Sequence, residues 1–300
     1  MGGSTIVKGV VPVAGMGTRL LPATKSQPKE MLPVGRRPVV QYVVEELQAA
    51  GLSQVLFVTG RKKTAIEDHF DADPELVRTL STGGGYALLE ELAFTETDTR
   101  FFYTRQSTPR GLGDAVNHAR EFAGEDHFVV ALGDSIIRDH DGSGYLTGLM
   151  KAHLASDAAC TVAVEEVARE EVYRYGVVKP AGEITTGGAF DVADLVEKPR
   201  IEASPSNLAI AARYVFSPAI FEALERTAPD RNGELQLTDA IKLLLQLGHR
   251  VIAVPLREGE RRYDIGNFES YFRAFIDFAL ADEKYGYMVR QYLKRKAREF

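Results

Sequence analysis

The stretch IVKGVVPVAGMGTRLLPATKSQPKEMLP, residues 6–33, decides the fold. Its beginning, Ile6 to Val13, is rich in β-branched apolar residues and predicts a buried strand. Glycines and cations follow directly, from Ala14 to Pro33. In an open α/β sheet, ligands bind at the carboxyl ends of the strands, and glycines let the backbone curl around phosphate groups. The stretch therefore predicts an α/β protein that binds a polyphosphate after its first strand.

Beyond this stretch, short apolar runs alternate with amphipathic segments, the pattern of a mostly parallel sheet with helices on both faces. The clearest helix is predicted from Val39 to Ala50, with its apolar residues on one face and Gly51 as its C-terminal cap. Further strands are predicted at residues 55–59, 100–104, 128–132, 160–167, 175–179, 194–197, 209–215 and 251–255, and further helices at residues 218–227, 238–247, 268–281 and 285–299. We expect an α/β fold with a Rossmann-like, mixed, mostly parallel central sheet flanked by helices, and with a C-terminal helical extension.

The chain has 300 residues, which is long for one simple core and short for two independent ones. The sequence shows no internal repeat and no low-complexity linker that would divide it. We therefore expect a single domain over residues 1–300, with three successive sub-regions: residues 1–145, residues 146–267 and residues 268–300.

The composition argues against several classes of protein. A formal net charge of −6 is unfavourable for binding the phosphate backbone of nucleic acids. The single cysteine, Cys160, rules out an intrachain disulfide and a multi-cysteine zinc site. The six histidines, at positions 69, 118, 127, 140, 153 and 249, show no metal-binding spacing. Because no apolar run is long enough to span a bilayer and no signal peptide is evident, we expect a cytoplasmic protein without nucleic-acid or membrane partners.

A dinucleotide-binding loop is the simplest alternative for the glycine-rich segment. The GxG of residues 15–17 fits such a loop, and the basic run of residues 61–63 has the charge to hold the 2′-phosphate of NADP. Three features oppose it. Leu20 occupies the third glycine position, Pro22 and Pro28 interrupt the helix that should receive the pyrophosphate, and no acidic residue closes the second strand. The sequence also lacks a P-loop ending in GKS or GKT, so an ordinary ATPase is not expected.

The segment GMGTRLLPATKSQPKEMLP resembles the signature of the sugar nucleotidylyltransferase family. Its PATK and PKEMLP forms are similar to those of the bacterial UTP-glucose-1-phosphate uridylyltransferases. Similar motifs recur in family order along almost the whole chain: QYVVEE at Gln41, AIEDHFD at Ala65, RQ at Arg105, GLGDAV at Gly111, GDSI at Gly133, YGVV at Tyr175, VEKP at Val196, PSNLAI at Pro205 and ELQLTDAI at Glu234. The resemblance implies a fold of the nucleotide-diphospho-sugar transferase type, with a nucleotide-binding half (1–145), a sugar-phosphate-binding half (146–267) and C-terminal helices (268–300).

The resemblance also implies a reaction, the transfer of a uridylyl group from UTP to glucose 1-phosphate to give UDP-glucose and pyrophosphate. The attacking phosphate oxygen is already an anion at neutral pH, so alignment and charge neutralisation are the main requirements, and magnesium is the expected cofactor. Within this chemistry, the alternatives are a thymidylyltransferase and a uridylyltransferase for another hexose 1-phosphate. Outside it, they are an NADP-dependent oxidoreductase and a catalytically silent relative.

Charged side chains at the ends of the predicted strands are the candidates for phosphate and metal binding. Arg19 and Lys29 follow the first strand and are expected to contact the triphosphate and to neutralise charge during transfer. Lys25 is as well explained by a surface position as by such a role. Asp134 follows the apolar strand HFVVALGD, and we expect it to emerge at the same edge of the sheet and to bind the nucleotide's magnesium. Asp264 in RRYDIGN is the candidate for a second metal carboxylate.

Recognition of the nucleotide is assigned by the resemblance. It implies that Gln106 binds the edge of uracil, for which a glutamine amide is suited because it both donates and accepts hydrogen bonds. Glu30 is expected to contact the nucleotide or to support the loop. Backbone groups and close glycines complete the set of nucleotide-binding residues: Ala14, Gly15, Gly17 and Gly111.

The VEKP motif ends an apolar strand just before a proline, so it presents two adjacent opposite charges at a rim. We expect Glu197 to accept hydrogen bonds from glucose hydroxyls and Lys198 to meet the sugar phosphate as a catalytic cation. Gly176 should let the backbone approach the sugar ring. This group is the expected sugar-binding site.

The sequence departs from the family pattern at several points. Arg110 stands where lysine is usual, Asp114 stands where histidine is common, GDSI replaces PDVL-like residues, and RRYDIGNFESYF replaces the usual GNKLGY form. These changes have the potential to retune the nucleotide or the sugar. Aromatic residues at positions 268, 271, 272, 275 and 278 lie at helical spacing, which predicts a packed core or a subunit face. The family resemblance implies a homo-oligomer, and we expect either a dimer or a tetramer.

Overall fold

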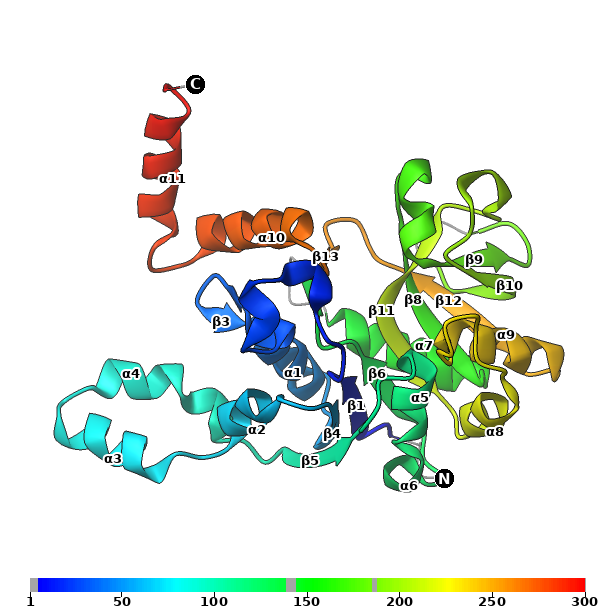
Figure 1. Cartoon of the computed structure of the whole chain (residues 1–300), viewed down its shortest axis with the longest axis horizontal. Helices are drawn as coiled ribbons and strands as arrows, with labels where there is room; N and C mark the ends of the chain where they lie inside the picture. The colour runs from blue at the N-terminus through cyan, green and yellow to red at the C-terminus, as the bar shows by residue number, and fades with distance from the viewer. Residues whose placement is uncertain (1–4, 139–143, 185–187, 300) are drawn as a thin grey trace.

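The computed structural model describes residues 5–138, 144–184 and 188–299. Within these residues a nine-stranded sheet crosses the molecule, with helices on both sides of it (Figure 1). The strand order is β5-β4-β1-β6-β11-β8-β12-β10-β9, and β9 also pairs with β11. The bounds are β1 Lys8–Pro12, β4 Gln54–Thr59, β5 Arg100–Arg105, β6 Phe128–Ala131, β8 Cys160–Glu166, β9 Gly176–Pro180, β10 Phe190–Glu197, β11 Leu208–Phe216 and β12 Val251–Pro255.

The directions of the strands differ between the two halves of the sheet. β5, β4, β1 and β6 are all parallel, so their carboxyl ends meet at one edge. β11 runs antiparallel to β6 and β8, and β10 runs antiparallel to β12 and β9, while β8 and β12 are parallel. Among the described strands of this sheet, β10 and β11 therefore oppose the other seven. This arrangement confirms the expected mixed, mostly parallel α/β sheet.

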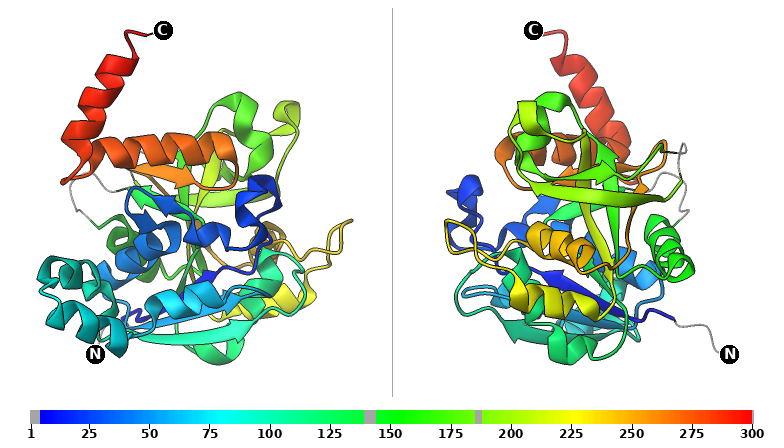
Figure 2. Two further views of the ribbon diagram at one scale, coloured as in Figure 1. Left: turned by 60° about the vertical axis from the view of Figure 1, so that its left-hand side comes forward. Right: turned by 90° about the vertical axis from the view of Figure 1, so that its right-hand side faces the viewer.

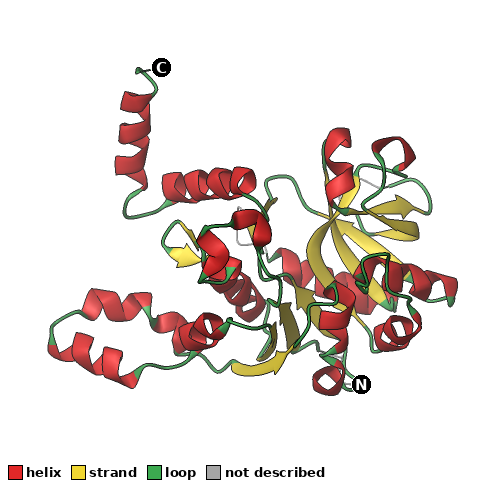
Figure 3. Ribbon diagram, viewed as in Figure 1, coloured by secondary structure: helices red, strands yellow, loops and turns green. Residues whose placement is uncertain are grey.

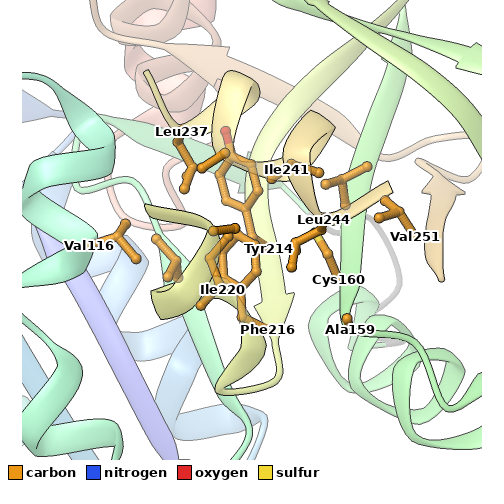
Figure 4. Close-up of a cluster of buried hydrophobic side chains, with 14 of the residues drawn as sticks. Val116, Ala159, Cys160, Tyr214, Phe216, Ile220, Leu237, Ile241, Leu244 and Val251 are labelled. Atoms are coloured by element: carbon orange, nitrogen blue, oxygen red, sulfur yellow. The ribbon is translucent and has the colours of Figure 1, made fainter. Parts of the chain in front are cut away.

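Helices cover both faces of the sheet because successive strand residues point to opposite sides. On one side Val10 faces a core layer that contains apolar residues of α5 (Leu112–Asn117), α6 (Arg120–Ala123), α8 (Ala219–Arg226) and α9 (Leu237–Gln246). On the other side Val11 faces a layer that contains residues of α1 (Val39–Ala49), α2 (Thr64–Phe70) and α7 (Tyr145–Ser156). Figure 4 shows part of the first layer, where Tyr214 and Phe216 of β11 lie against Leu237 and Ile241 of α9.

Two small two-stranded sheets lie outside the main one. β2 (Pro33–Val34) pairs with β3 (Arg37–Pro38), and β7 (Ser135–Arg138) pairs with β13 (Arg261–Asp264). The sequence did not predict β7 or β13, because each is only four residues long and β13 consists mostly of charged residues. The second pair has a direct consequence for the site: it sets Asp264 opposite Ser135, the residue after Asp134.

Two parts of the chain project from the body (Figures 1 and 2). One is the pair α3 (Pro74–Thr82) and α4 (Tyr86–Glu91), in which no residue is buried. The other is α11 (Gly286–Lys296), the second helix of the predicted C-terminal extension. The first helix, α10 (Phe268–Ala281), packs against β2 and β13 and leads into α11 (Figure 3). In the described parts of the chain, no helix is both long and apolar enough to cross a membrane.

Most predicted elements agree with the structure to within two residues at each end. The main difference among the strands is β10, which begins at Phe190, four residues before the predicted start at Asp194. Asp191 and Asp194 are charged residues within this strand, and they interrupt its apolar pattern in the sequence. The late aromatic residues divide between the two predicted roles, because Phe278 packs against a small core with Tyr263 whereas Phe272 is exposed.

Candidate active site

The glycine-rich loop after β1 folds into three short turns of 3-10 helix and not into one long helix. The turns are η1 (Thr18–Leu20), η2 (Ala23–Lys25) and η3 (Lys29–Met31). The hydroxyl of Thr24 donates a hydrogen bond to the carbonyl oxygen of Gly17 at 2.7 Å, which ties the second turn to the start of the first. The prediction that prolines prevent a dinucleotide-type helix is therefore confirmed.

A cavity of about 320 Å³ opens at the carboxyl ends of β1 and β6, beside this loop. Predicted nucleotide residues that line it are Ala14, Gly15, Lys29, Glu30, Gln106, Gly111 and Asp134. The other lining residues are Pro12, Met16, Pro109, Leu112, Ala115, Leu132 and Glu234. We call this space the loop cavity. Residues from distant parts of the chain therefore meet where the carboxyl ends of the parallel strands were expected to bring them.

A partly buried ion pair joins Lys29 and Asp134 in the loop cavity, where the ammonium group donates a hydrogen bond to the carboxylate. Burial alone would lower the pKa of Lys29, but the negative charges of Asp134 and Glu30 outweigh burial and raise it. Burial likewise opposes ionisation of Asp134, yet the charge and hydrogen bond of Lys29 lower its pKa. Both groups therefore keep their charges at neutral pH.

The second predicted metal residue, Asp264, lies next to Asp134. The backbone N–H of Ile265 donates to the carbonyl oxygen of Asp134 at 2.9 Å. Burial and the negative charge of Asp134 raise the pKa of Asp264, as expected for two neighbouring carboxyl groups. Arg19 lies on the same side: a guanidinium nitrogen of Arg19 and Oδ1 of Asp264 are 3.2 and 2.9 Å from the position that a β-carbon on Gly266 would take.

Arg19 is exposed, whereas Lys29 is partly buried, and the positive charge of Arg19 lowers the pKa of both Asp134 and Asp264. Two carboxylates and two cations thus form one charged group at the rim of the sheet. Among the residues that the structure describes, no cluster of three or more His, Cys, Asp or Glu side chains is arranged to hold a metal ion, and His140 lies outside them. Any divalent ion here would have to take its remaining ligands from phosphate oxygens and water, which is the way magnesium is usually bound.

Glu30 is held by a partner that the sequence did not identify. It is 1% exposed, and Nζ of Lys63 lies 2.7 Å from its Oε2, inside the protein. Burial raises the pKa of Glu30, against the opposing effect of Lys63 and Lys29. Lys63 belongs to the basic run of residues 61–63, whose charge also fits the 2′-phosphate of NADP. In the structure Lys63 instead pairs with Glu30 and neutralises the charge of its carboxylate.

The residues around the predicted base site are fixed by hydrogen bonds. The amide nitrogen of Gln106 donates to the carbonyl oxygen of Gly111 at 3.2 Å and to Oδ2 of Asp114 at 2.6 Å. Gly111 has a φ of 95°, and an added β-carbon would lie 2.6 Å from the carbonyl oxygen of Leu235. The backbone N–H of Leu235 also donates to the carbonyl oxygen of Arg110 at 2.7 Å. Glycine is therefore required at 111 because another loop packs directly against it.

The predicted sugar residues lie in a second cavity of about 420 Å³, which we call the VEKP cavity. It is lined by Leu195, Val196, Glu197, Lys198, Asp230, Asn232, Glu234, Gln236, Asp239 and Lys242. The hydroxyl of Thr238 donates to Oε2 of Glu197 at 2.7 Å, and Nζ of Lys198 is 3.3 Å from Oε1 of the same carboxylate. A β-carbon at Gly176 would lie 2.8 Å from the Thr238 hydroxyl and 3.2 Å from Glu197. The absence of a side chain at Gly176 therefore lets the backbone of β9 lie close to the Glu197 carboxylate.

Lys198 has an unusual backbone conformation, with a φ of 43°. A non-glycine residue rarely adopts the left-handed region, and such residues are frequent at functional sites. The backbone N–H of Lys198 donates to the carbonyl oxygen of Tyr175 at 3.0 Å, which holds the end of β10 against the YGVV segment. The side chain of Lys198 is 57% exposed, so the ammonium group is available to a ligand.

The two cavities adjoin each other but are not one space. Glu234 lines both of them, and Lys198 lines only the VEKP cavity. Tyr214 of the central strand β11 is buried close to both cavities. Burial raises the pKa of its hydroxyl, and the negative charges of Glu197 and Asp134 raise it further. Lys29 and Asp134 therefore line the loop cavity, and Glu197 and Lys198 line the neighbouring VEKP cavity. Arg19 and Asp264 line neither of these two cavities.

Two further cavities lie nearby. Lys25 lines one of about 270 Å³ together with Arg61 and Lys62, on the far side of Gly15 and Met16 from the loop cavity. The larger one, of about 660 Å³, shares only Asp264 with the charged group described above. There the guanidinium of Arg262 pairs with Glu165 and lies over the Tyr175 ring. Because most predicted site residues line the loop and VEKP cavities and only Asp264 lines this one, we take the loop and VEKP cavities as the candidate active site.

Comparison with known proteins identifies the family of this chain. The family model described as nucleotidyl transferase matches residues 8–279. A putative UTP-glucose-1-phosphate uridylyltransferase of Methanocaldococcus jannaschii is 45% identical over 91% of this chain and 93% of its own. The UTP-glucose-1-phosphate uridylyltransferase of Bacillus subtilis is 42% identical over 92% of each chain.

A solved structure is similar over almost the whole chain. The UTP-bound UGPase of Acinetobacter baumannii superposes with a TM-score of 0.89 at 38% identity, over 96% of this chain and 99% of that one. The expected fold of the nucleotide-diphospho-sugar transferase type is therefore confirmed. With a family model matching nine-tenths of its length and curated relatives above 40% identity, this chain belongs to the nucleotidyl transferase family.

Proposed function

We propose that this protein transfers the uridylyl group of UTP to glucose 1-phosphate and releases pyrophosphate. The observation that most supports this proposal is the pair of adjoining cavities. One is lined by Lys29, Asp134 and Gln106, and the other by Glu197 and Lys198. The similar proteins of Bacillus subtilis and Acinetobacter baumannii, named as a UTP-glucose-1-phosphate uridylyltransferase and as a UTP-bound UGPase, support the choice of substrates.

The chemistry requires little of the protein beyond position and charge. A phosphate oxygen of glucose 1-phosphate forms a bond to the α-phosphorus of UTP, and the bond from that phosphorus to the bridging oxygen of pyrophosphate breaks. Lys29, and Arg19 from the exposed side, would neutralise the triphosphate, and Lys198 would neutralise the sugar phosphate and reduce the repulsion between the two anions. In this proposal no residue is covalently modified.

Magnesium is the cofactor that this group of residues would suit. Asp134 and Asp264 offer two neighbouring carboxylates, and magnesium prefers one or two of these together with phosphate oxygens and water. Bound there, the ion would supply further positive charge to the phosphates. Lys29 would keep Asp134 ionised and oriented, and Arg19 would do the same from the exposed side.

Recognition of the two substrates is proposed for residues already described. Gln106 would meet the edge of the uracil base, with Ala14, Gly15, Gly17 and Gly111 supplying backbone around the nucleotide. Glu197 would accept hydrogen bonds from glucose hydroxyls beside Gly176. Glu30 lines the loop cavity, but its carboxylate is already bound by Lys63, so it would support the loop and not bind the nucleotide directly.

The test is an assay of purified protein with magnesium, in which each of UTP, dTTP and CTP is paired with glucose 1-phosphate or galactose 1-phosphate. We expect pyrophosphate release and a UDP-sugar product to be greatest for UTP with glucose 1-phosphate, and to stop when the metal is chelated. A preference for dTTP, or for another sugar phosphate, would assign the protein to a different member of the family. The absence of pyrophosphate release in every pairing would overturn the proposal.

We also propose that the protein acts as a homo-oligomer in the cytoplasm. The support for association is the exposed apolar surface of the C-terminal extension, which includes Phe272, Ile276, Tyr287, Met288 and Tyr292. Contiguous apolar surface of this kind on a protein often marks a protein contact. Light scattering of the full chain and of a variant with Phe272, Ile276 and Met288 changed to serine tests this. A full chain that is monomeric at all concentrations would contradict it.

A further inference from the structure

The orientation of the Gln106 side chain is determined by its neighbours. Gln106 is 3% exposed and lines the loop cavity, so its amide group is the part available to a ligand. Its two nearest partners are the carbonyl oxygen of Gly111, at 3.2 Å, and Oδ2 of Asp114, at 2.6 Å. A carbonyl oxygen and an ionised carboxylate can only accept hydrogen bonds.

These two acceptors commit both amide hydrogens of Gln106. If the amide were turned over, its oxygen would face the Asp114 carboxylate at hydrogen-bond distance, and two acceptors would repel each other. The oxygen Oε1 is therefore the atom that Gln106 presents to a ligand. Gln106 acts in this setting as a hydrogen-bond acceptor only.

Asp114 is suited to hold this orientation. It lies in the first turn of α5, outside the set of residues that line the loop cavity, and its side chain is 16% exposed. Its carboxylate is also 3.9 Å from the guanidinium of Arg110 and 3.9 Å from Nδ1 of His118. Asp114 thus touches Gln106 but not the cavity.

We propose that Asp114 is a positioning residue that makes Gln106 select bases with a ring N–H donor. Uracil and thymine carry a hydrogen on N3, which can donate to Oε1, whereas N3 of cytosine is an acceptor and would face Oε1 without a hydrogen between them. A site built to pair with a donor rejects an analogue that lacks it, because the buried group is left unpaired. The inference rests on the proposed function and adds the origin of its base preference.

The test compares UTP, dTTP and CTP as substrates with glucose 1-phosphate, in the wild type and in Asp114→Asn. Asparagine has the same shape but can donate, so Gln106 becomes free to turn its amide nitrogen toward the cavity. We expect the ratio of kcat/KM for UTP to that for CTP to fall at least about 10-fold in the variant. The ratio for UTP to dTTP should stay within about 2-fold, because thymine presents the same edge.

Two further variants complete the design. Asp114→Glu keeps an acceptor-only side chain and should retain the preference for UTP over CTP. Asp126→Asn removes one carboxylate charge from an exposed pair with Lys8 and should change neither ratio. Thermal unfolding of each variant reports on folding separately, and a merely structural defect would lower the rates for UTP and CTP alike.

The outcomes separate this inference from the proposed function. If the wild type releases pyrophosphate from UTP and Asp114→Asn leaves the UTP to CTP ratio unchanged, the inference is overturned while the proposed function stands. Equal use of CTP and UTP by the wild type overturns it as well. If the wild type uses no nucleotide, the proposed function itself fails.

Discussion

The loop cavity and the VEKP cavity differ in how their charged residues are held. In the loop cavity Lys29 is paired with Asp134, Glu30 is paired with Lys63, and Gln106 is held by Asp114. In the VEKP cavity the charges are more exposed, and Lys198 makes only a 3.3 Å contact with Glu197. The comparison indicates that the proposed nucleotide side is organised before any ligand arrives, whereas the proposed sugar side keeps a cation that is exposed and only loosely paired.

The strongest test of the organised side is Asp134→Asn. The change removes one negative charge from the group formed with Lys29 and Asp264 and leaves the shape of the side chain unchanged. We expect kcat with UTP and glucose 1-phosphate to fall at least about 1,000-fold, since one preorganised charged group is lost at the reacting phosphates. Steady-state kinetics across magnesium concentrations measure the effect, and circular dichroism checks the fold. Rates close to wild type would exclude Asp134 as an essential metal ligand.

The next largest effect is expected on stability and not on rate. Lys63→Met leaves the 1% exposed carboxyl of Glu30 without its nearest cation. Breaking a buried pair from one side typically costs about 3 kcal/mol of unfolding free energy. Urea unfolding of this variant and of Lys63→Met with Glu30→Gln measures it, and the double variant should recover part of the loss. A loss of under about 1 kcal/mol in the single variant would show that Lys29 alone suffices for Glu30.

On the sugar side, Lys198→Ala should weaken the use of glucose 1-phosphate and leave the nucleotide largely unaffected. We expect kcat/KM for glucose 1-phosphate to fall about 100-fold, with KM for UTP within about 3-fold of wild type. Lys242→Ala is the matched control, because Lys242 lines the same cavity but is already paired with Asp194 at 2.8 Å. A similar effect of both changes would mean that the cavity responds only to its total charge.

The smallest expected effect on activity lies outside both cavities and provides a reference for pH experiments. His153 is buried between His127 and Thr161, and burial together with His127 lowers its pKa to about 3. Because the unfolded histidine takes up a proton near pH 6.5 and the folded one does not, the contribution to stability is complete above pH 6.5 and is lost as pH falls from there toward 3.

Below pH 6.5, the unfolding free energy should therefore decline with a contribution from His153 of at most about 1.4 kcal/mol per pH unit. His153→Gln should reduce the slope between pH 6.5 and 4, and His249→Gln, on the turn after α9, serves as the control. Urea unfolding at several pH values checks this. Equal slopes in the wild type and both variants would count against it.

Much of the fold and of the site follows from patterns that are local in the sequence. The strands β1, β6 and β8 were predicted because each is a run of apolar residues, and the helices α1 and α10 because their apolar residues recur at helical spacing. The group formed by Lys29, Asp134 and Gly15 was predicted because the carboxyl ends of parallel strands share one edge. The roles given to these residues remain predictions, as does the division of the chain into sub-regions.

What the sequence did not predict depends on contacts between distant segments. Lys63 and Asp114 were not assigned to the site, because nothing local distinguishes a lysine that neutralises Glu30 or an aspartate that orients Gln106. Thr238 and Glu234 come from the ELQLTDAI motif, whose position beside Glu197 depends on the packing of α9 on β10. The only sequence signal for Asp114 was that it stands where the family commonly has histidine, and this did not indicate what Asp114 does.

The stereochemical course of the transfer tests the central claim most directly. The account holds that the sugar phosphate and UTP lie side by side on two adjoining cavities and react in one displacement at the α-phosphorus. With one diastereomer of a UTP analogue that carries sulfur on the α-phosphate, the account predicts inversion of configuration at phosphorus in the UDP-glucose product. Retention of configuration would require two displacements, and hence a covalent intermediate on the protein, and would contradict it.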